Sequence, residues 1–287
     1  TQSAHRATSS TRCRLAVDGL SDARSLRPPP TDRHLHAMDT PIASRLHLVD
    51  AYPRGTSQPH NFLFRGNNPM SKNNSTFPLS SLEKMLRGSS LQECAVAVPE
   101  SIRFVDLFLE NPTDPGYANE VTFWRDRTDG DLIKYPTFGS LFVPWDTPLP
   151  FRTELIVNGT WAVQGHRDYL TERLAAVRSM LTNTSSPPTL FYAHCNAGCD
   201  RTGEFIAAYA MTFLKYNVTT AYGEACRQCG RCPNYYATNS IGWYCLTLQQ
   251  LYNRTDLGDC LDFAGCKLFG DCDAHSPTKP ANPCPAS

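Results

Sequence analysis

The sequence lacks any excess of charge of one sign. Its 287 residues include 27 Lys and Arg and 27 Asp and Glu, so the formal net charge at pH 7 is zero. A basic surface usually marks nucleic-acid or anionic-membrane binding, so we expect neither partner. Long apolar runs are also missing: none reaches the roughly 18 residues of a membrane-spanning helix, so we expect no transmembrane segment. The 41% of hydrophobic residues is still enough for a globular core.

Cysteine is abundant, with 12 residues in the chain. The sequence also contains several Asn-x-Ser/Thr sequons, the acceptor motif of N-linked glycans. Dense cysteine together with sequons favours an oxidising and glycosylating compartment, so we expect a secreted or lumenal protein. The candidate glycan acceptors are Asn73, Asn74, Asn158, Asn183, Asn217 and Asn253.

Composition divides the chain into three parts. Residues 1–45 are rich in Ser, Thr, Arg and Pro, which predicts a poorly ordered extension. Residues 46–256 have a globular pattern, and residues 257–287 form a Cys- and Pro-rich tail. Alternating strands and helices in the middle part predict an α/β fold with a central, mostly parallel sheet flanked by helices. The expected strands are 60–66, 101–110, 138–146 and 190–194, and the expected helices are 79–88, 167–181, 204–216 and 239–252.

The stretch LFYAHCNAGCDRTGEF, from Leu190, predicts a buried strand, a short loop and a helix. In such a unit the loop amides and the helix N-terminus face one point, which makes a site for an anion. Arg201 adds a planar fork that suits two phosphate oxygens, and Cys195 places a thiol beside the phosphorus. Gly198 and Gly203 let the backbone approach the oxygens. The residues thus indicate chemistry through a cysteinyl-phosphate intermediate.

HCNAGCDRTG resembles the His-Cys-x5-Arg-Ser/Thr-Gly loop of the cysteine-dependent protein tyrosine phosphatase superfamily, including its dual-specificity members. More weakly, NFLFRGNNP and SIRFVDLFLE are similar to the opening of the compact dual-specificity type. The resemblance covers residues 60–252 and implies a protein tyrosine phosphatase-like fold that needs no metal or cofactor. It implies that Cys195 is the nucleophile, Arg201 the phosphate clamp, and Thr202 a group that stabilises the thiolate. Phosphate binding is implied for Asn196, Ala197, Gly198, Cys199, Asp200 and Arg201, with His194 and Gly203 supporting the loop.

Hydrolysis also needs a proton for the leaving oxygen, and two aspartates are candidates. Asp146, in VPWDTPLPF, resembles the acid-loop aspartate of the superfamily, although the order Pro-Trp-Asp and the 49-residue spacing to Cys195 depart from the common pattern. The extra length is assigned to an exposed insertion at 152–165. Asp200 resembles the aspartate in the loops of myotubularin-like and atypical bacterial lipid phosphatases. It either handles the proton or holds the loop by accepting backbone amides.

The remaining cysteines leave several alternatives open. Cys199 is either a resolving thiol for oxidised Cys195 or a small loop residue. With these two set aside, ten cysteines are left, a number that fits five disulfides of unknown pairing. The segment CRQCGRC at 226–232 is compatible with disulfides or with zinc.

The favoured function is phosphomonoester hydrolysis of the protein tyrosine or dual-specificity type. A phosphoinositide or inositol phosphate is the alternative substrate. It is less favoured because Asn196, Ala197, Cys199 and Asp200 bring no basic side chain to the loop. Two other classes stay open: an inactive phosphate-binding module, and a secreted Cys-rich structural protein.

Overall fold

The structure is a computed structural model that describes residues 41–70, 77–114, 116–162, 167 and 169–264. All of them belong to one compact unit, Met38–Ser287. The predicted N-terminal extension lies outside the described residues except for 41–45. Asn73, Asn74 and the tail beyond 264 lie outside them as well.

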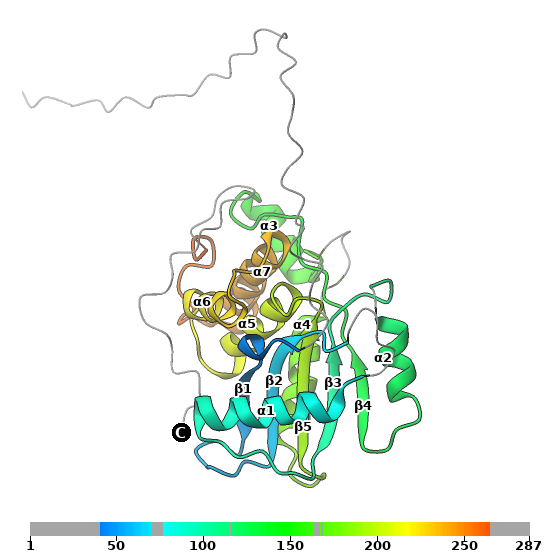
Figure 1. The fold of residues 1–287 in the computed structure, drawn as a ribbon. Coiled ribbons are helices and arrows are strands. Elements are labelled where there is room, and N and C mark those ends of the chain that lie inside the picture. Colours follow the sequence, from blue (N-terminus) through cyan, green and yellow to red (C-terminus); the bar gives the residue numbers. More distant parts are fainter. Residues whose placement is uncertain (1–40, 71–76, 115, 163–166, 168, 265–287) are drawn as a thin grey trace, which may run out of the picture. The chain divides into compact units, whose positions relative to one another are not determined.

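Five strands form one sheet in the order β1-β2-β5-β3-β4 (Figure 1). Strand β1 pairs with β2 in an antiparallel manner, and the other three pairings are parallel. The mostly parallel sheet expected from the sequence is therefore confirmed. The strands are β1 (His47–Tyr52), β2 (Asn61–Asn67), β3 (Arg103–Phe108), β4 (Gly130–Lys134) and β5 (Thr189–Cys195).

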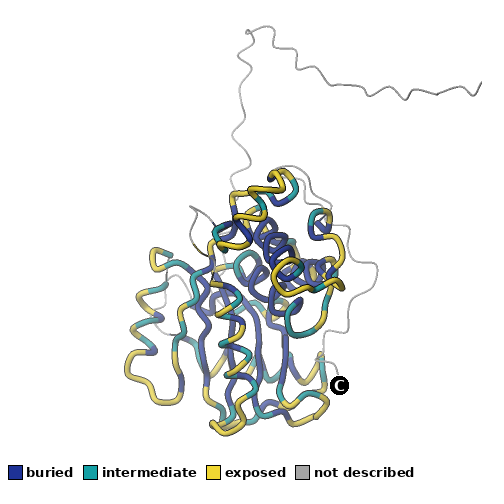
Figure 2. Tube along the Cα trace, turned by 180° about the vertical axis from the view of Figure 1, so that it is seen from behind, coloured by how far each residue is buried: buried dark blue, intermediate teal, exposed yellow. Residues whose placement is uncertain are grey.

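Helices cover both faces of the sheet because side chains along each strand alternate between the faces. One face carries Leu63, Val105 and Phe191 in a core with the buried sides of α4 (Leu170–Thr182) and α5 (Arg201–Phe213). The opposite face packs against α1 (Leu79–Cys94) and α2 (Tyr117–Trp124). Its buried side chains include Phe62, Phe64, Phe104, Leu190 and Tyr192. Figure 2 shows the strands buried along most of their length, as this double coverage requires.

Three further helices complete the fold: α3 precedes α4 in the chain, and α6 and α7 follow α5. Helices α6 (Val218–Cys229) and α7 (Tyr235–Tyr252) pack against α5, and α3 (Leu149–Asn158) packs against α7. Among the described residues, no helix has the length and apolar character needed to cross a membrane.

The structure corrects the expected strand at 138–146. This segment is irregular: Ser140 N–H donates to Tyr236 O at 2.9 Å, and Trp243 Nε1 donates to Phe142 O at 2.8 Å. Backbone groups of Ser140 and Phe142 thus bond to α7 and not to a strand, and the edge strand of the sheet is β4 instead. The sequence pattern also gave no indication of α2, α3 and α6. In the exposed insertion expected at 152–165, residues 152–158 belong to α3, which buries Leu155 and Ile156, and residues 163–165 lie outside the described residues.

Helix α1 continues past Gly88, where the sequence predicted its end. A Cβ at Gly88 would meet nothing within 4 Å, so this glycine lies on an open side of the helix. The buried side of the helix, with Leu82, Leu86 and Ser90, continues past Gly88, and the helix ends where Ala95 adopts the left-handed conformation. Tertiary packing therefore outweighs the helix-breaking preference of a single glycine.

Candidate active site

Cys195 is the last residue of β5, the central strand of the sheet. Its Cα pairs with Asn67 of β2, and the preceding His194 pairs with Phe108 of β3. The side chain is 4% exposed, and among the described cysteines Cys195 is the one without a disulfide. The thiol thus lies at the carboxyl edge of parallel strands, where open α/β sheets bind their ligands.

The loop after Cys195 turns its carbonyl groups outward. Asn68 N–H donates to Cys195 O at 2.8 Å, and Arg45 and Arg65 donate to loop carbonyls from outside. Among the described residues, no acceptor is found for the backbone N–H groups of the loop at four positions. These are Asn196, Ala197, Cys199 and Asp200. Because the loop carbonyls are bonded to neighbouring elements and these N–H groups are not, we infer that the N–H groups are available as donors to an anion.

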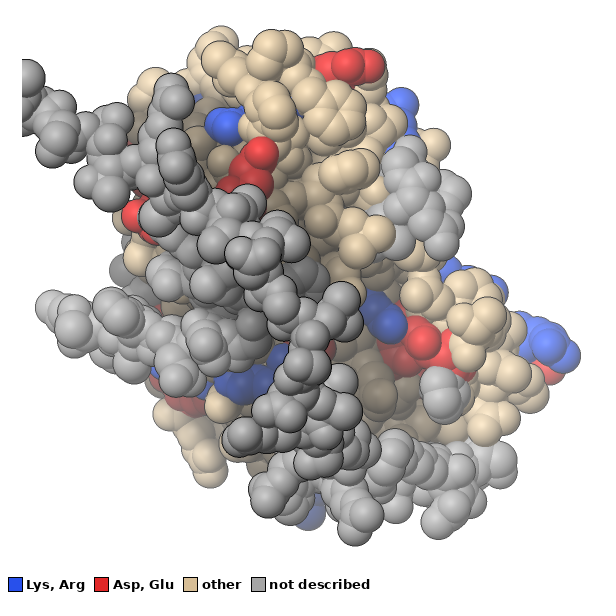
Figure 3. Space-filling model, turned by 90° about the horizontal axis from the view of Figure 1, so that it is seen from above, with Lys and Arg blue, Asp and Glu red and all other residues tan. Residues whose placement is uncertain are grey.

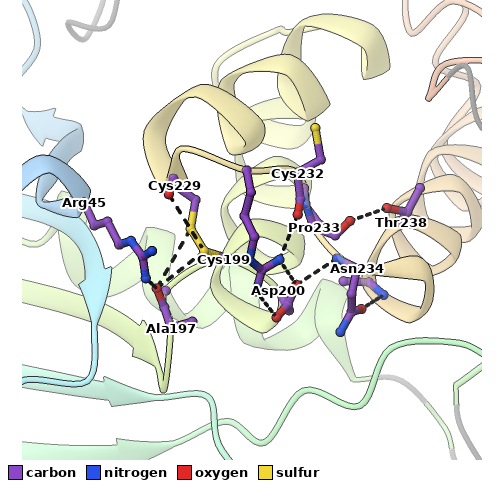
Figure 4. Close-up of polar contacts among 12 residues, drawn as sticks. Arg45, Ala197, Cys199, Asp200, Cys229, Cys232, Pro233, Asn234 and Thr238 are labelled. Carbon is purple, nitrogen blue, oxygen red and sulfur yellow. Dashed lines mark hydrogen bonds and ion pairs between the residues drawn. A yellow bond between two sulfur atoms is a disulfide. The ribbon is translucent and has the colours of Figure 1, made fainter. Parts of the chain in front are cut away.

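Four consecutive loop residues are each bonded to a neighbouring element, and Figure 4 shows three of them: Ala197, Cys199 and Asp200. Two of the ties are arginine–carbonyl hydrogen bonds, one is a disulfide and one is a bidentate ion pair. They join Arg45 Nη1 to Ala197 O (2.7 Å), Arg65 Nη2 to Gly198 O (2.5 Å), Cys199 to Cys229, and both Arg231 Nη atoms to Asp200 (2.8 Å each). The loop is therefore held in one shape before any ligand binds, as a preorganised site requires.

Arg201 begins α5 and contacts a carboxylate from another loop. Its Nη1 donates to Asp114 Oδ2 at 2.5 Å, and Asp114 lies between β3 and α2. Burial opposes the charge of Arg201, but the attraction of Cys195 and Asp114 outweighs it and raises the pKa of the guanidinium. In a view from above, Figure 3 shows basic and acidic side chains next to each other at a hollow in this face.

Positive charge surrounds the Cys195 sulfur on several sides. Arg45, Arg65 and Arg201 all interact electrostatically with Cys195. Arg65 is fully buried, and this burial, together with repulsion from Arg227, lowers its pKa to about 10 against the attraction of Cys195. The three guanidinium groups thus bring positive charge to the place where we expect an anionic ligand such as phosphate.

His194 belongs to a buried polar cluster behind the loop. Its Nε2 donates to Asp106 Oδ1 at 2.7 Å and lies 3.5 Å from Glu120 Oε2. Burial opposes a charge on His194, but Asp106 and Glu120 outweigh it and raise the pKa of the imidazole well above its usual value. His194 O also accepts Leu109 N–H at 3.1 Å, so the residue braces β5 against β3.

The same cluster has the composition of a metal site, because the ligand atoms of Asp106, Glu120 and His194 lie within 4.8 Å of one another. Asp106 is, however, already hydrogen-bonded through both carboxylate oxygens, to His194 and to Trp124 Nε1 at 2.9 Å. The arrangement is that of a hydrogen-bonded ion pair in which Asp106 needs no further partner.

Thr202 and the two glycines take positions that fit the predicted site. The Thr202 side chain is fully buried, and its hydroxyl has no hydrogen-bond partner among the described residues. The expected role of Thr202 in stabilising the thiolate stays a prediction. Gly198 has φ +72°, and a Cβ there would overlap the carbonyl of Gly66. Gly203 N–H donates to Cys199 O at 3.1 Å, and a Cβ would come within 3.0 Å of Pro233.

The two predicted acids differ in their surroundings. Asp200 Oδ1 accepts the backbone N–H of Asn234 at 2.7 Å, and both carboxylate oxygens bind Arg231. Of the two roles predicted for Asp200, the structure therefore supports the one of holding the loop. Asp146 is exposed and forms no hydrogen bond or ion pair within the described part of the chain, so its role stays a prediction.

The cysteine expectations need correction. Cys199 forms a disulfide with Cys229, so it is not a free resolving thiol. It also belongs among the disulfide-forming cysteines, from which the sequence-based expectation excluded it. The zinc alternative for 226–232 is wrong in this structure, because Cys226 pairs with Cys232. A third disulfide joins Cys245 of α7 to Cys260.

Three residues of the site were missed in the sequence. Arg65 lay inside the quoted segment NFLFRGNNP without a role, and nothing in the sequence pointed to Arg45. Asp114 had one usable signal. It follows the strand at 103–108 in a Pro- and Gly-flanked loop, and loops after neighbouring parallel strands meet at one edge of a sheet.

No protein-family model and no curated protein matches the sequence. Solved structures similar to the chain include a Leishmania major protein described as a putative protein tyrosine phosphatase (16% identity, 70% of this chain and 96% of that one, TM-score 0.38). Human DUSP28 (15%, 73% and 99%, TM-score 0.35) and a mouse putative dual specificity phosphatase complexed with zinc tungstate (16%, 66% and 86%, TM-score 0.34) are similar as well. These are phosphatases of the kind that the loop sequence resembles. At such TM-scores the likeness carries no argument of its own, and the chemistry must be inferred from the residues of the loop.

Proposed function

We propose that this protein is a cysteine-dependent phosphomonoesterase with Cys195 as nucleophile. One observation carries the proposal: a free, buried thiol lies at the base of a loop whose amides have no protein acceptor in the described chain, with Arg201 at its far end. Such a loop binds the oxygens of a phosphate and presents the phosphorus to the sulfur. The disulfide and ion pair that fix the loop support the same interpretation.

The reaction has two steps. The Cys195 thiolate attacks the phosphorus, the ester bond to the leaving oxygen breaks, and that oxygen takes a proton from a carboxyl group. Water then attacks the cysteinyl phosphate, and the thiolate leaves. Arg201 and the loop amides hold the phosphoryl oxygens through both steps, which stabilises the charge of each transition state.

Phosphotyrosine in a protein is the substrate class that we favour. Arg45 and Arg231 bring positive charge to the loop from outside, but Arg231 is paired with Asp200 and Arg45 with the carbonyl of Ala197. Asp200 balances the charge of Arg231, and the bond to Ala197 O occupies one donor of Arg45, so the loop is less suited to the extra phosphates of an inositol phosphate or phosphoinositide, the alternative substrates. Rates on a phosphotyrosine peptide and on a phosphoinositide, measured side by side, distinguish the two.

An inactive phosphate-binding module is the competing class. Cys195→Ser and Arg201→Lys test it with phenyl phosphate in the presence of a chelator. Cys195→Ser should retain less than about 1% of the turnover, because the covalent route is lost. Arg201→Lys should lose more than about tenfold, because a point charge cannot replace the bidentate fork. Wild-type protein that binds phosphate and turns over no ester would support the module instead.

We also propose that the protein works in an oxidising compartment, secreted or lumenal. Three disulfides among the described residues support this, since such bonds are rare in the cytosol. Four sequon asparagines are exposed and so accessible to glycosylation: Asn158, Asn183, Asn217 and Asn253. Protein isolated from its native source should shift in mass on treatment with an N-glycosidase. An unshifted mass together with reduced cysteines would contradict the proposal.

A further inference from the structure

A carboxylate that the sequence did not indicate lies at the phosphate clamp. Asp114 Oδ2 accepts a hydrogen bond from Arg201 Nη1 and another from the backbone N–H of Asn111 at 2.8 Å. The backbone N–H of Asp114 in turn donates to Asn111 O at 2.9 Å. The side chains of Asp114 and Arg201 are 24% and 29% exposed. The carboxylate is thus held by its own turn at a place that solvent and a ligand reach.

A bound phosphate and Asp114 must share Arg201. If the guanidinium binds two phosphate oxygens as a fork, it either releases Asp114 or keeps it through Nη1. In the second case the carboxylate stays hydrogen-bonded to Arg201, and in the first it is set free next to the bound phosphate. We expect it then to come within hydrogen-bond reach of the ester oxygen, as proton transfer requires.

Binding of phosphate also changes the charge around Asp114. In the unliganded protein, Arg201 attracts Asp114 as an anion. A phosphate dianion neutralises that attraction and places negative charge beside the carboxylate. Two described groups, Arg201 of α5 and Glu110 after β3, interact electrostatically with Asp114; Cys195 of β5 interacts with that Arg201, and His194 of β5 with that Glu110. Glu110 is almost completely buried, and burial raises its pKa against the attraction of His194.

The two aspartates predicted from the sequence are less well placed. Asp200 is occupied by Arg231 and by the backbone of Asn234. The segment before Asp146 runs along α7, away from the N-terminal end of this helix, where Asn234 contacts Asp200. Phe142 O accepts a hydrogen bond from Trp243 Nε1, and Trp243 lies nine residues, or roughly 13 Å along the helix, from Asn234. Asp114 is the one of the three that contacts Arg201.

We propose that Asp114 is the proton donor to the leaving oxygen, held on Arg201 until substrate phosphate takes its place. When phosphate binds, Asp114 takes up a proton from water. As the S–P bond forms and the P–O bond breaks, this proton moves to the leaving oxygen. The resulting carboxylate accepts a proton from the water that then hydrolyses the cysteinyl phosphate. The inference rests on the proposed function.

Leaving-group dependence tests the assignment directly. Asp114→Asn keeps the shape of the side chain and removes the proton. It should lower kcat for phenyl phosphate by roughly 10²–10⁴ and leave dinitrophenyl phosphate within about fivefold of wild type, because dinitrophenolate leaves without a proton. Asp146→Asn is the competing variant, and under this proposal it should not show that dependence on the leaving group.

Three results would overturn the assignment. Full activity of Asp114→Asn on phenyl phosphate would show that the carboxyl is not needed. An equal loss on both esters would mean that Asp114 only positions Arg201. A loss confined to phenyl phosphate in Asp146→Asn would make Asp146 the donor, as the sequence pattern predicts.

Calorimetry gives a second readout that needs no turnover. Inorganic phosphate is titrated into Cys195→Ser in two buffers that differ in ionisation enthalpy. We expect uptake of about one proton per bound phosphate, lost in the double variant Cys195→Ser/Asp114→Asn. Unchanged uptake in the double variant contradicts the proposal. Failure of the proposed function can be told apart from failure of the Asp114 assignment. In the first case, either the wild-type protein would hydrolyse neither of the two esters, or Cys195→Ser would stay active.

Discussion

The disulfide between Cys199 and Cys229 should be required for activity as well as for stability. It joins the phosphate loop to the last residue of α6 across 30 residues of sequence, and both cysteines are buried. Replacing both by alanine removes the tie without leaving a free thiol. The chain-entropy relation for a closed loop of this length gives a loss of about 3.6 kcal/mol in the free energy of unfolding.

Activity should fall together with stability, because two of the other ties reach the loop through the same region. Arg231, two residues after Cys229, holds Asp200, and Gln228 accepts a hydrogen bond from Arg65 at 3.1 Å. Release of Cys229 therefore loosens the support of several loop residues at once. Small misplacements of reacting groups cost on the order of 10² in rate, and we expect a loss of that order in kcat/KM for phenyl phosphate.

The disulfide between Cys245 and Cys260 provides a matched control. It closes 15 residues, for which the same relation gives about 3 kcal/mol, and it connects α7 to the segment after it. Guanidinium unfolding should show similar losses for the two double alanine variants, while kcat/KM falls only for Cys199→Ala/Cys229→Ala. For the same reason dithiothreitol should inactivate the wild-type protein. Equal activity of both variants, or activation by dithiothreitol, would refute the reasoning.

Two further predictions concern the loop and the buried cluster. Gly198→Ala should reduce kcat/KM on the order of 10²-fold, since its Cβ would overlap the carbonyl of Gly66. Gly258, with φ +81° and open space around it, is the control, and Gly258→Ala should cost only about 1–2 kcal/mol of stability. Equal activity of the two variants would contradict this prediction. Burial raises the pKa of Glu120 from 4.5 to about 7, against the attraction of His194, so this group favours folding below about pH 4.5 and its contribution is lost as the pH rises through 7. Urea unfolding should therefore show wild-type stability falling by roughly 2–3 kcal/mol between pH 5 and pH 8 relative to Glu120→Gln, and parallel pH profiles would show that Glu120 does not titrate there.

The sequence alone predicts the strand, loop and helix around Cys195 well because these parts are contiguous. Cys195, Gly198 and Arg201 lie within seven residues, and an apolar strand and an amphipathic helix flank them. Local pattern therefore determines both the loop and the elements that hold it. The central position of this strand in the sheet follows less directly, since it depends on pairing with β2 and β3.

Groups that reach the loop from distant segments could not be predicted in this way. Arg45 and Arg65 precede the loop by more than a hundred residues, and Asp114 lies between β3 and α2. Only the folded chain brings these side chains to one edge of the sheet. The pairing of Cys199 with Cys229 is hidden for a related reason, because a count of cysteines does not determine their connectivity.

Secondary structure was misjudged where hydrophobicity and position disagree. The apolar segment at 138–146 resembles a strand, but the backbone groups of Ser140 and Phe142 form hydrogen bonds with α7. Strand β4 is short, partly exposed and at the edge of the sheet, so it lacks the apolar alternation of a half-buried strand. In both cases the outcome depends on the neighbouring elements and not on the local pattern.

The most direct test of the central claim is to trap the intermediate. Wild-type protein is denatured with dodecyl sulfate during turnover of a radiolabelled phosphotyrosine peptide, and the labelled residue is then identified. We expect the phosphoryl group on Cys195 of the wild type and no covalent label in Cys195→Ser. A phosphoryl group on another residue, or turnover by Cys195→Ser without any trapped intermediate, would contradict the assignment of Cys195 as the nucleophile.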